Sequence, residues 1–227
     1  KLFLIYICLL FPLTGVAQKK QLQTVRDQIK SGKELTKAEN TLRGLLVDSA
    51  SKKNSKIWLL LCDALTKQYE QGNEKLYLKQ KYDTAALFSV TRKLYDVMSR
   101  FDSLDAQPDA KGRVRAKYRA KHAAFLNSIR PNLFNGGSYF VHKKDYKTAF
   151  DYYTDYLLSA NYPLFESYDY MQRDALIPHA AYWAMFCGYK LGDADKIMRF
   201  KDQAERDTSM LNFVRQYEAE AYLVKKD

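Results

Sequence analysis

The sequence predicts an all-α protein, and two observations lead to this fold class. Glycine and proline, which interrupt regular elements, are scarce, with 9 and 5 copies in 227 residues. Apolar residues recur at intervals of three and four along most of the chain, a spacing that places them on one face of a helix. Since apolar residues make up 47% of the sequence, the chain is expected to be globular rather than disordered.

The best-defined helical pattern covers residues 132–163, where two predicted helices are joined by a short Lys-Lys-Asp turn. The first helix presents Leu133, Gly137 and Phe140 on one face. The second presents four residues on one face: Tyr146, Ala149, Tyr153 and Leu157. Because side-chain size at the contact sets the distance between packed helices, the small residues Gly137 and Ala149 predict a close approach.

This pair resembles the tetratricopeptide repeat, a two-helix unit with the signature W-x2-L-G-x2-Y, then A-x3-F, then P. The Trp, Gly, Tyr, Ala and Phe positions are taken in order by Leu133, Gly137, Phe140, Ala149 and Tyr153. Pro163 follows two residues late. The resemblance implies antiparallel helix pairs that stack as a right-handed α-solenoid, with each pair burying one face against its neighbours.

Two earlier helix pairs are predicted on weaker matches. Residues 19–52 form a degenerate repeat, with Gly32 ending its first helix. The positions of the signature there are taken by Leu22, Val25, Ile29, Ala38 and Leu42. The second pair opens on Trp58-x2-Leu61-Cys62-x2-Leu65, and its first helix is expected to continue through Gln71 towards Leu78. Its partner helix spans 82–101, with a core face of Leu87, Leu94, Val97 and Phe101.

A basic run, KGRVRAKYRAKHAAFLNSI, occupies residues 111–129. Alternation of apolar and basic residues over 114–121 suggests a strand, but the alanine content and a longer apolar stripe favour a helix. That stripe consists of Val114, Tyr118, His122, Phe125 and Ile129. On such a helix Arg113, Lys117 and Lys121 share one flank, and Pro131 either kinks the helix or starts a new one.

The C-terminal part is expected to hold a fourth pair and the start of a fifth. Residues 181–191 and 194–204 form the fourth pair, joined by Leu-Gly-Asp, and Phe213 opens the next helix. The segment 223–227 is similar to 141–145, which precedes the second helix of the best pair. The chain is therefore expected to stop inside a repeat, so that one irregular repeat domain covers residues 18–227.

Residues 1–17 have the pattern of a secretory signal. Lys1 is followed by an apolar run that ends in Gly15-Val16-Ala17, with small residues before the expected cleavage after Ala17. A buried first helix or a membrane anchor would explain the same pattern, although the run is shorter than the ~20 residues that a spanning helix needs. Export to the periplasm or cell envelope of a Gram-negative bacterium follows, with no transmembrane span after signal removal. The formal charge would then fall from +11 to +10 through loss of Lys1.

Chemical motifs do not point to an enzyme. The sequence has no G-x-S-x-G, H-E-x-x-H or G-x-G-x-x-G motif, and its three histidines stand in separate segments. We therefore expect no catalytic residue, no cofactor and no metal site. Cys62 and Cys187 are expected to be buried hydrophobes, and export leaves a disulfide between them open.

The candidate partner-binding residues come from two sources. The tetratricopeptide resemblance implies a ligand face on the first helix of each pair, which in the best pair carries Phe134, Ser138, Val141 and His142. The basic run adds Arg113, Lys117 and Lys121, which either face an acidic partner or solvate a helix flank. The net charge is compatible with acidic partners in general, whereas export argues against nucleic acid.

The resulting hypothesis is an exported tetratricopeptide-like scaffold that binds a protein or peptide in the cell envelope. An envelope protein that binds or processes carbohydrate is the alternative, because the 18 tyrosines offer rings that can stack on sugars.

Overall fold

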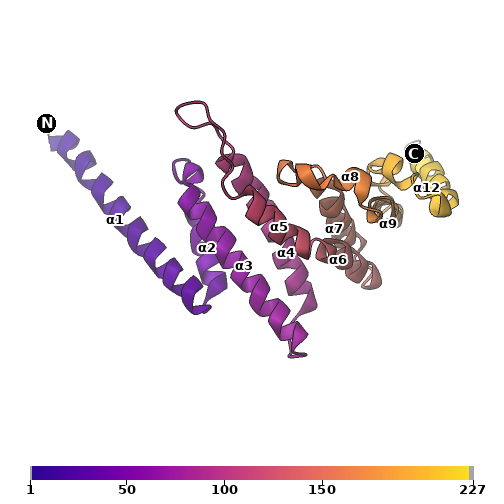
Figure 1. The fold of residues 1–227 in the computed structure, drawn as a ribbon, viewed down its shortest axis with the longest axis horizontal. Coiled ribbons are helices and arrows are strands. Elements are labelled where there is room, and N and C mark those ends of the chain that lie inside the picture. The colour runs from indigo at the N-terminus through magenta and orange to yellow at the C-terminus, as the bar shows by residue number, and fades with distance from the viewer. Residues whose placement is uncertain (1, 225–227) are drawn as a thin grey trace. The chain divides into compact units, whose positions relative to one another are not determined.

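The computed structural model describes residues 2–224, and it describes side chains from Ala17 onward. All regular structure in this part of the chain is helical, which confirms the predicted all-α class (Figure 1). The chain divides into two compact units. Unit 1 comprises Lys1–Tyr82 and Arg100–Ala116, and unit 2 comprises Asp83–Ser99 and Lys117–Asp227.

Unit 1 contains three helices that pack against one another in sequence order, followed by the end of a fourth. Helix α1 contacts both α2 and α3, and α2 packs along α3. The elements are α1 (Leu2–Ser31), α2 (Leu35–Leu45), the 3-10 turn η1 (Ser51–Lys53), α3 (Ser55–Tyr77) and the last residues of α4 (Thr84–Asp105).

Local sequence explains where these helices begin and end. Gly32 adopts φ +69°, a left-handed conformation that ends α1 as its spacing predicts. The side chain of Asn54 caps α3 by accepting a hydrogen bond from the backbone N–H of Lys56. The Gln71 amide donates to the Gly32 carbonyl at 2.9 Å and so ties α3 to the end of α1. The long α3 predicted towards Leu78 is confirmed, since the helix ends at Tyr77.

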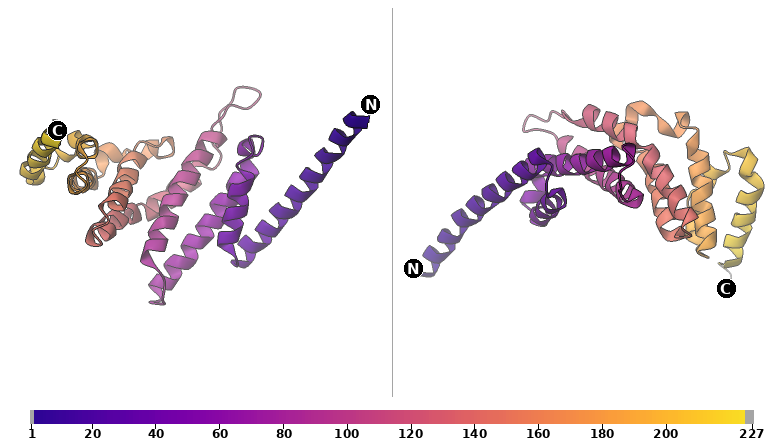
Figure 2. Two further views of the ribbon diagram at one scale, coloured as in Figure 1. Left: turned by 180° about the vertical axis from the view of Figure 1, so that it is seen from behind. Right: turned by 90° about the horizontal axis from the view of Figure 1, so that it is seen from below.

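Unit 2 holds the first sixteen residues of α4 and the remaining helices. Most of these helices pack against the next long helix in sequence, and α9 also contacts α12. They lie side by side in Figure 2. Their bounds are α5 (Arg119–Ile129), α6 (Pro131–His142), α7 (Tyr146–Ser159), η2 (Pro163–Tyr168), α8 (Tyr170–Arg173), α9 (Leu176–Lys190), α10 (Ala194–Met198), α11 (Lys201–Ala204), η3 (Thr208–Met210) and α12 (Leu211–Val224).

The α6–α7 pair confirms the two packed helices predicted over residues 132–163 and their close approach at Gly137. A Cβ atom on Gly137 would lie 2.6 Å from the ring of Tyr153, and the neighbouring Gly136 stands equally close to Tyr152. Two successive glycines therefore receive two successive tyrosine rings. Ala149 is fully buried beside them.

The turn between α6 and α7 and the turn between α9 and α10 lead into the same kind of helix cap. The Asp145 side chain accepts from the backbone N–H of Thr148, and the Asp193 side chain accepts from that of Lys196. A left-handed residue precedes each aspartate, Lys144 at φ +59° and Gly192 at φ +64°. The fourth pair therefore forms as predicted, except that its second helix is interrupted between Met198 and Lys201.

The prediction that the helix of the basic run includes residues 114–118 is wrong. The helix α5 begins only at Arg119, and residues 106–118 form a loop. The carboxylate of Asp109 accepts the backbone N–H groups of Lys111 and Arg113, which diverts both from a helical pattern. Gly112 and Ala116 also have positive φ angles, +73° and +35°. Pro131 starts a new helix, one of the two predicted outcomes.

The predicted signal lies almost entirely among residues whose side chains are outside the described part of the chain. No helix within the described part is both long and apolar enough to cross a bilayer. Cys62 and Cys187 are free, buried thiols, one in each unit. Burial raises the pKa of both thiols, that of Cys187 to about 12.

Candidate functional site

The first helix of the best pair does carry the four predicted binding residues, but they differ in how open they are. Phe134 is half-buried, with its ring edge-to-face with Tyr153 and Tyr156 at centroid distances of 5.5 and 5.8 Å. The Ser138 hydroxyl shares a hydrogen bond of 3.1 Å with the Tyr153 hydroxyl. Both side chains therefore take part in packing α6 on α7.

Val141 and His142 lie at the other end of α6. Val141 is half-buried and His142 is exposed. Lys143 follows them with its ammonium 5.6 Å from the centre of the Tyr139 ring. This end of α6 is thus the more open and the more positively charged part of the predicted face.

A continuous series of ring contacts extends this face from α6 across α9 to α12. We call it the aromatic row: Phe134, His179, Trp183, Phe186, Tyr217 and Tyr189, with successive centroid distances of 5.9, 6.2, 5.3, 6.2 and 4.8 Å. Most of these rings are half-buried, so they are fixed by neighbours while part of each remains open. Rings held in this way offer apolar contact area at a small conformational cost.

His179 sits at the α6 end of the aromatic row and is held from three sides. Its ring stacks on Phe134 with 20° between the planes. Its Nε2 accepts from the Trp183 indole N–H at 3.1 Å, and its Nδ1 lies 3.8 Å from Asp207. The indole donor requires an unprotonated Nε2, so the hydrogen-bond pattern places the ring proton on Nδ1, towards Asp207.

The α12 end of the row is bordered by positive charge. The Lys190 ammonium lies 5.4 Å from the centre of the Phe186 ring and 5.2 Å from that of Tyr189. Such cation–π contacts keep a lysine near the rings while its charge stays exposed to water. The row therefore combines apolar ring area with a cationic border.

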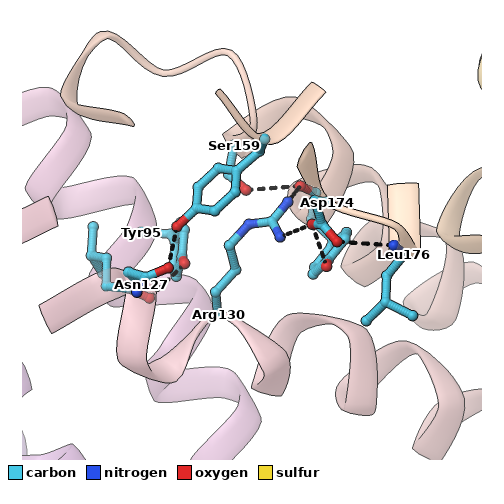
Figure 3. Close-up of polar contacts among 9 residues, drawn as sticks. Tyr95, Asn127, Arg130, Ser159, Asp174 and Leu176 are labelled. Atoms are coloured by element: carbon cyan, nitrogen blue, oxygen red, sulfur yellow. Dashed lines mark hydrogen bonds and ion pairs between the residues drawn. The ribbon is translucent and has the colours of Figure 1, made fainter. Parts of the chain in front are cut away.

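A separate polar cluster is built around Arg130, at the junction of α5 and α6 (Figure 3). Its guanidinium lies between two rings, 3.8 Å from the centre of Tyr156 and 4.0 Å from that of Tyr170. It pairs with Asp174, which also accepts from the Tyr156 hydroxyl at 2.7 Å. The Tyr170 hydroxyl donates to Asn127. We call these five residues the Arg130 cluster.

Burial dominates the electrostatics of the Arg130 cluster. The side chains of Arg130 and Asp174 are only 5% and 11% exposed. Burial raises the pKa of both tyrosines, that of Tyr170 to about 12, so both rings stay neutral at physiological pH. The cluster joins α5, α6, α7 and the 160–175 connection, which makes it first of all a structural tie.

A pocket of about 360 Å³ opens beside this cluster. It is lined by three tyrosine rings together with amide, carboxylate and guanidinium groups: Tyr156, Tyr168, Tyr170, Asn127, Asp174, Arg130 and Arg173. Rings next to hydrogen-bonding side chains are the composition that a small polar ligand requires.

The three residues of the predicted basic flank do not share one helix, because α5 begins only at Arg119. Arg113 belongs to the loop of unit 1, Lys117 precedes α5 in unit 2, and Lys121 alone of the three lies on a helix. The Arg113 guanidinium is also paired with Asp109 at 2.9 Å. His122, on the proposed stripe, is buried in unit 2.

The side chains described here contain no group of three or more His, Cys, Asp or Glu that could hold a metal ion. Comparisons with known proteins do not place the chain in a family. No protein-family model matches it, and neither a functionally characterised protein nor a solved structure does.

Of the aromatic row, only Phe134 was predicted from the sequence as a binding residue. The row depends on a ring contact between α6 and α9 and on the packing of α12 against α9. The irregular connection of residues 160–175 obscures this arrangement in the sequence. One signal was available in retrospect, since His179, Trp183 and Phe186 recur at helical spacing on α9.

Proposed function

We propose that the chain is a tetratricopeptide-like scaffold of the bacterial cell envelope that binds a protein or peptide. The observation that carries this proposal is the aromatic row, a set of fixed, half-open rings that runs over three packed helices. Aromatic side chains with these properties dominate the binding energy of protein interfaces. Packing of each helix mainly on its sequence neighbours supports a solenoid of helix pairs.

The expected partner is acidic, because Lys143 and Lys190 stand beside open rings and the whole chain carries a formal charge of +11. A partner segment with apolar side chains over the rings and carboxylates near these lysines would match the face. Attraction of this kind acts mainly on the association rate and weakens as salt rises.

The test is a pull-down from a bacterial envelope extract with the wild-type chain and Trp183→Ala. Loss of the ring at the centre of the row should remove the captured partner. Tyr222→Ala is the matched control, because Tyr222 is 55% exposed on α12 and makes no ring contact within the row. Circular dichroism of both variants checks that the fold is retained. Equal capture by all three proteins would contradict the proposal.

Carbohydrate binding is the second candidate, and the pocket beside the Arg130 cluster favours it. Tyrosine rings next to Asn127 and Arg173 could stack on a sugar ring and hydrogen-bond its hydroxyls. A glycan array probed with the wild-type chain and Tyr168→Ala would test this. Glycan binding that depends on Tyr168 and not on Trp183 would favour this second function over the first.

A further inference from the structure

The end of α3 presents two neighbouring apolar side chains to solvent. Tyr77 is 84% exposed and Leu78 is 54% exposed. They stand at the C-terminal end of the longest helix whose side chains are all described, beyond Gly72, its last buried residue. Large apolar groups at adjacent exposed positions call for an explanation that a single exposed residue does not.

The backbone holds these two residues in a regular turn rather than in an open loop. The N–H of Gln80 donates to the carbonyl of Lys75 at 2.8 Å, and the N–H of Lys79 donates to that of Leu76 at 3.0 Å. Lys79 adopts φ +55°. These are the two hydrogen bonds and the left-handed residue of a Schellman motif, so the exposed pair is presented in a defined geometry.

The chain after the turn is anchored back onto α3. The ring of Tyr82 fills the space at Gly72, where an added Cβ would lie 2.6 Å from its hydroxyl oxygen. The Lys75 ammonium lies 5.8 Å from the centre of the same ring. Tyr82 is thus used for packing, whereas Tyr77 and Leu78 are not.

Lysines outnumber acidic residues near the exposed pair. Residues 75–82 contain three exposed lysines, Lys75, Lys79 and Lys81, and no acidic residue. The nearest acids in sequence are Glu74, in the preceding turn of α3, and Asp83, whose carboxylate caps α4 by accepting the N–H of Ala85. Basic side chains therefore frame Tyr77 and Leu78 on both sides in the sequence.

We propose that residues 75–82, which we call the α3 tip, dock on the surface of an anionic lipid bilayer. Tyrosine is favoured at the level of the headgroups, and leucine adds apolar area that can enter the acyl boundary. Lysines beside an anionic leaflet each contribute about a fivefold gain in partition, the factor that ~1 kcal/mol per lysine corresponds to. The area that two apolar side chains can bury is far less than the ~800 Å² per partner of a standard protein interface. This favours lipid over protein as the occupant.

This docking goes beyond the proposed scaffold function and is independent of it. The α3 tip belongs to unit 1, whereas the aromatic row belongs to unit 2. A chain that holds a partner through one unit and a bilayer through the other would confine that partner to the membrane surface.

The test places a reporter at the tip of the full-length chain through Tyr77→Trp, which keeps an aromatic ring. The probe is a vesicle of equal parts phosphatidylglycerol and phosphatidylcholine, compared with one of phosphatidylcholine alone. The emission that the new indole adds to that of Trp58 and Trp183 should shift to shorter wavelength with the anionic vesicle only. Brominated lipid should quench it, and added salt should reverse the shift.

Matched variants separate the tip from any other contact of the chain with lipid. In the reporter chain, Lys75→Gln, Lys79→Gln and Lys81→Gln together should raise the lipid concentration needed by roughly 100-fold, the product of three fivefold factors. Lys143→Gln with Lys144→Gln removes charge from a similar turn in unit 2 and should have little effect. Val47→Trp places the same reporter at a different position in unit 1 that is 76% exposed, and its emission should not respond.

Three results would overturn the proposal. They are no shift from the Tyr77→Trp chain, an equal shift of its emission with the neutral vesicle, and an equal response from the Val47→Trp chain. A shift that grows with protein concentration in the absence of lipid would instead assign the tip to contact with a second copy of the chain. None of these results bears on capture of a partner by the aromatic row, so each proposal can fail alone.

Discussion

Two arginines of unit 2 form the same kind of contact at two depths. Arg130 pairs with Asp174 and lies over the ring of Tyr156, while Arg92 pairs with Asp155 and lies over that of Tyr152 at 4.8 Å. The two tyrosines stand one turn apart on α7. The Arg130 pair is 5% and 11% exposed, and the Arg92 pair is 33% and 32% exposed.

The depth of burial changes what an arginine, an aspartate and a tyrosine in this arrangement contribute to stability. Around Arg92, water screens the attraction, so the pair is expected to add little to stability. Burial acts to lower the pKa of Arg92, but Asp155 outweighs it, and the pKa of Arg92 is raised. Burial also raises the pKa of Asp155, and Arg92 offsets this only in part. Around Arg130 the charges are almost fully removed from water, so either ion would be costly without the other.

The largest effect should come from breaking the buried pair. Arg130→Ala leaves Asp174 buried without its counter-ion, so we expect the free energy of unfolding to fall by about 3–5 kcal/mol. Urea denaturation monitored by circular dichroism measures this. Asp174→Asn tests the pair from the other side and should also destabilise strongly. A loss below ~1 kcal/mol for Arg130→Ala would show that the cluster relaxes to admit water.

The Tyr152 ring, over which Arg92 lies, offers the next test. Gly136→Leu would push Tyr152 away, because even a Cβ atom would lie 2.6 Å from that ring. We expect a loss of roughly 2–4 kcal/mol from overpacking. Gly137→Leu should cost as much through Tyr153, which belongs to neither arginine site. Gly44→Ala is the control, since nothing lies within 4 Å of the added group. An unchanged denaturation midpoint in both leucine variants would contradict the packing described.

Removing the half-buried Arg92 should have a much smaller effect. Arg92→Ala is expected to cost about 1 kcal/mol or less, and part of that cost should disappear at high salt. Denaturation of Arg92→Ala and Arg130→Ala at low and high sodium chloride compares the two depths directly. If the cost of Arg92→Ala matched that of Arg130→Ala, depth would not be the deciding factor.

The smallest effect concerns Asp145, whose partner is a backbone N–H rather than an arginine. The hydrogen bonds from Thr148 lower the pKa of Asp145. A carboxylate with a lowered pKa stabilises the fold above its unfolded pKa, and this contribution is lost as the pH falls through the folded value. Asp145→Asn keeps a capping oxygen without titrating, so its stability should change less than that of the wild type below about pH 4. Because Asp145 is exposed and water screens its charge, the difference should stay well under ~1 kcal/mol. Parallel acid titrations of both chains would decide this.

Sequence patterns located most helices because their core residues lie close together in the chain. The α6–α7 pair follows from the spacing of Leu133, Gly137 and Ala149, and the C-terminal end of α3 was predicted to within a residue. The loop before α5 was missed because Asp109 captures backbone N–H groups, a local competition that apolar periodicity does not record. The Arg130 cluster could not be foreseen, since Arg130 and Asp174 are 44 residues apart and meet only once the 160–175 connection is folded.

Each unit contains one buried thiol whose alkylation can report when that unit opens. Cys62 is 1% exposed in unit 1 and Cys187 is fully buried in unit 2. A thiol of this kind reacts with an alkylating reagent only when its surroundings open, and its raised pKa keeps the reactive thiolate scarce until then. The labelling rate at each site therefore reports the opening free energy of the unit around it. If the two rates differ under native conditions, the units open separately, even though the single helix α4 contributes residues to both.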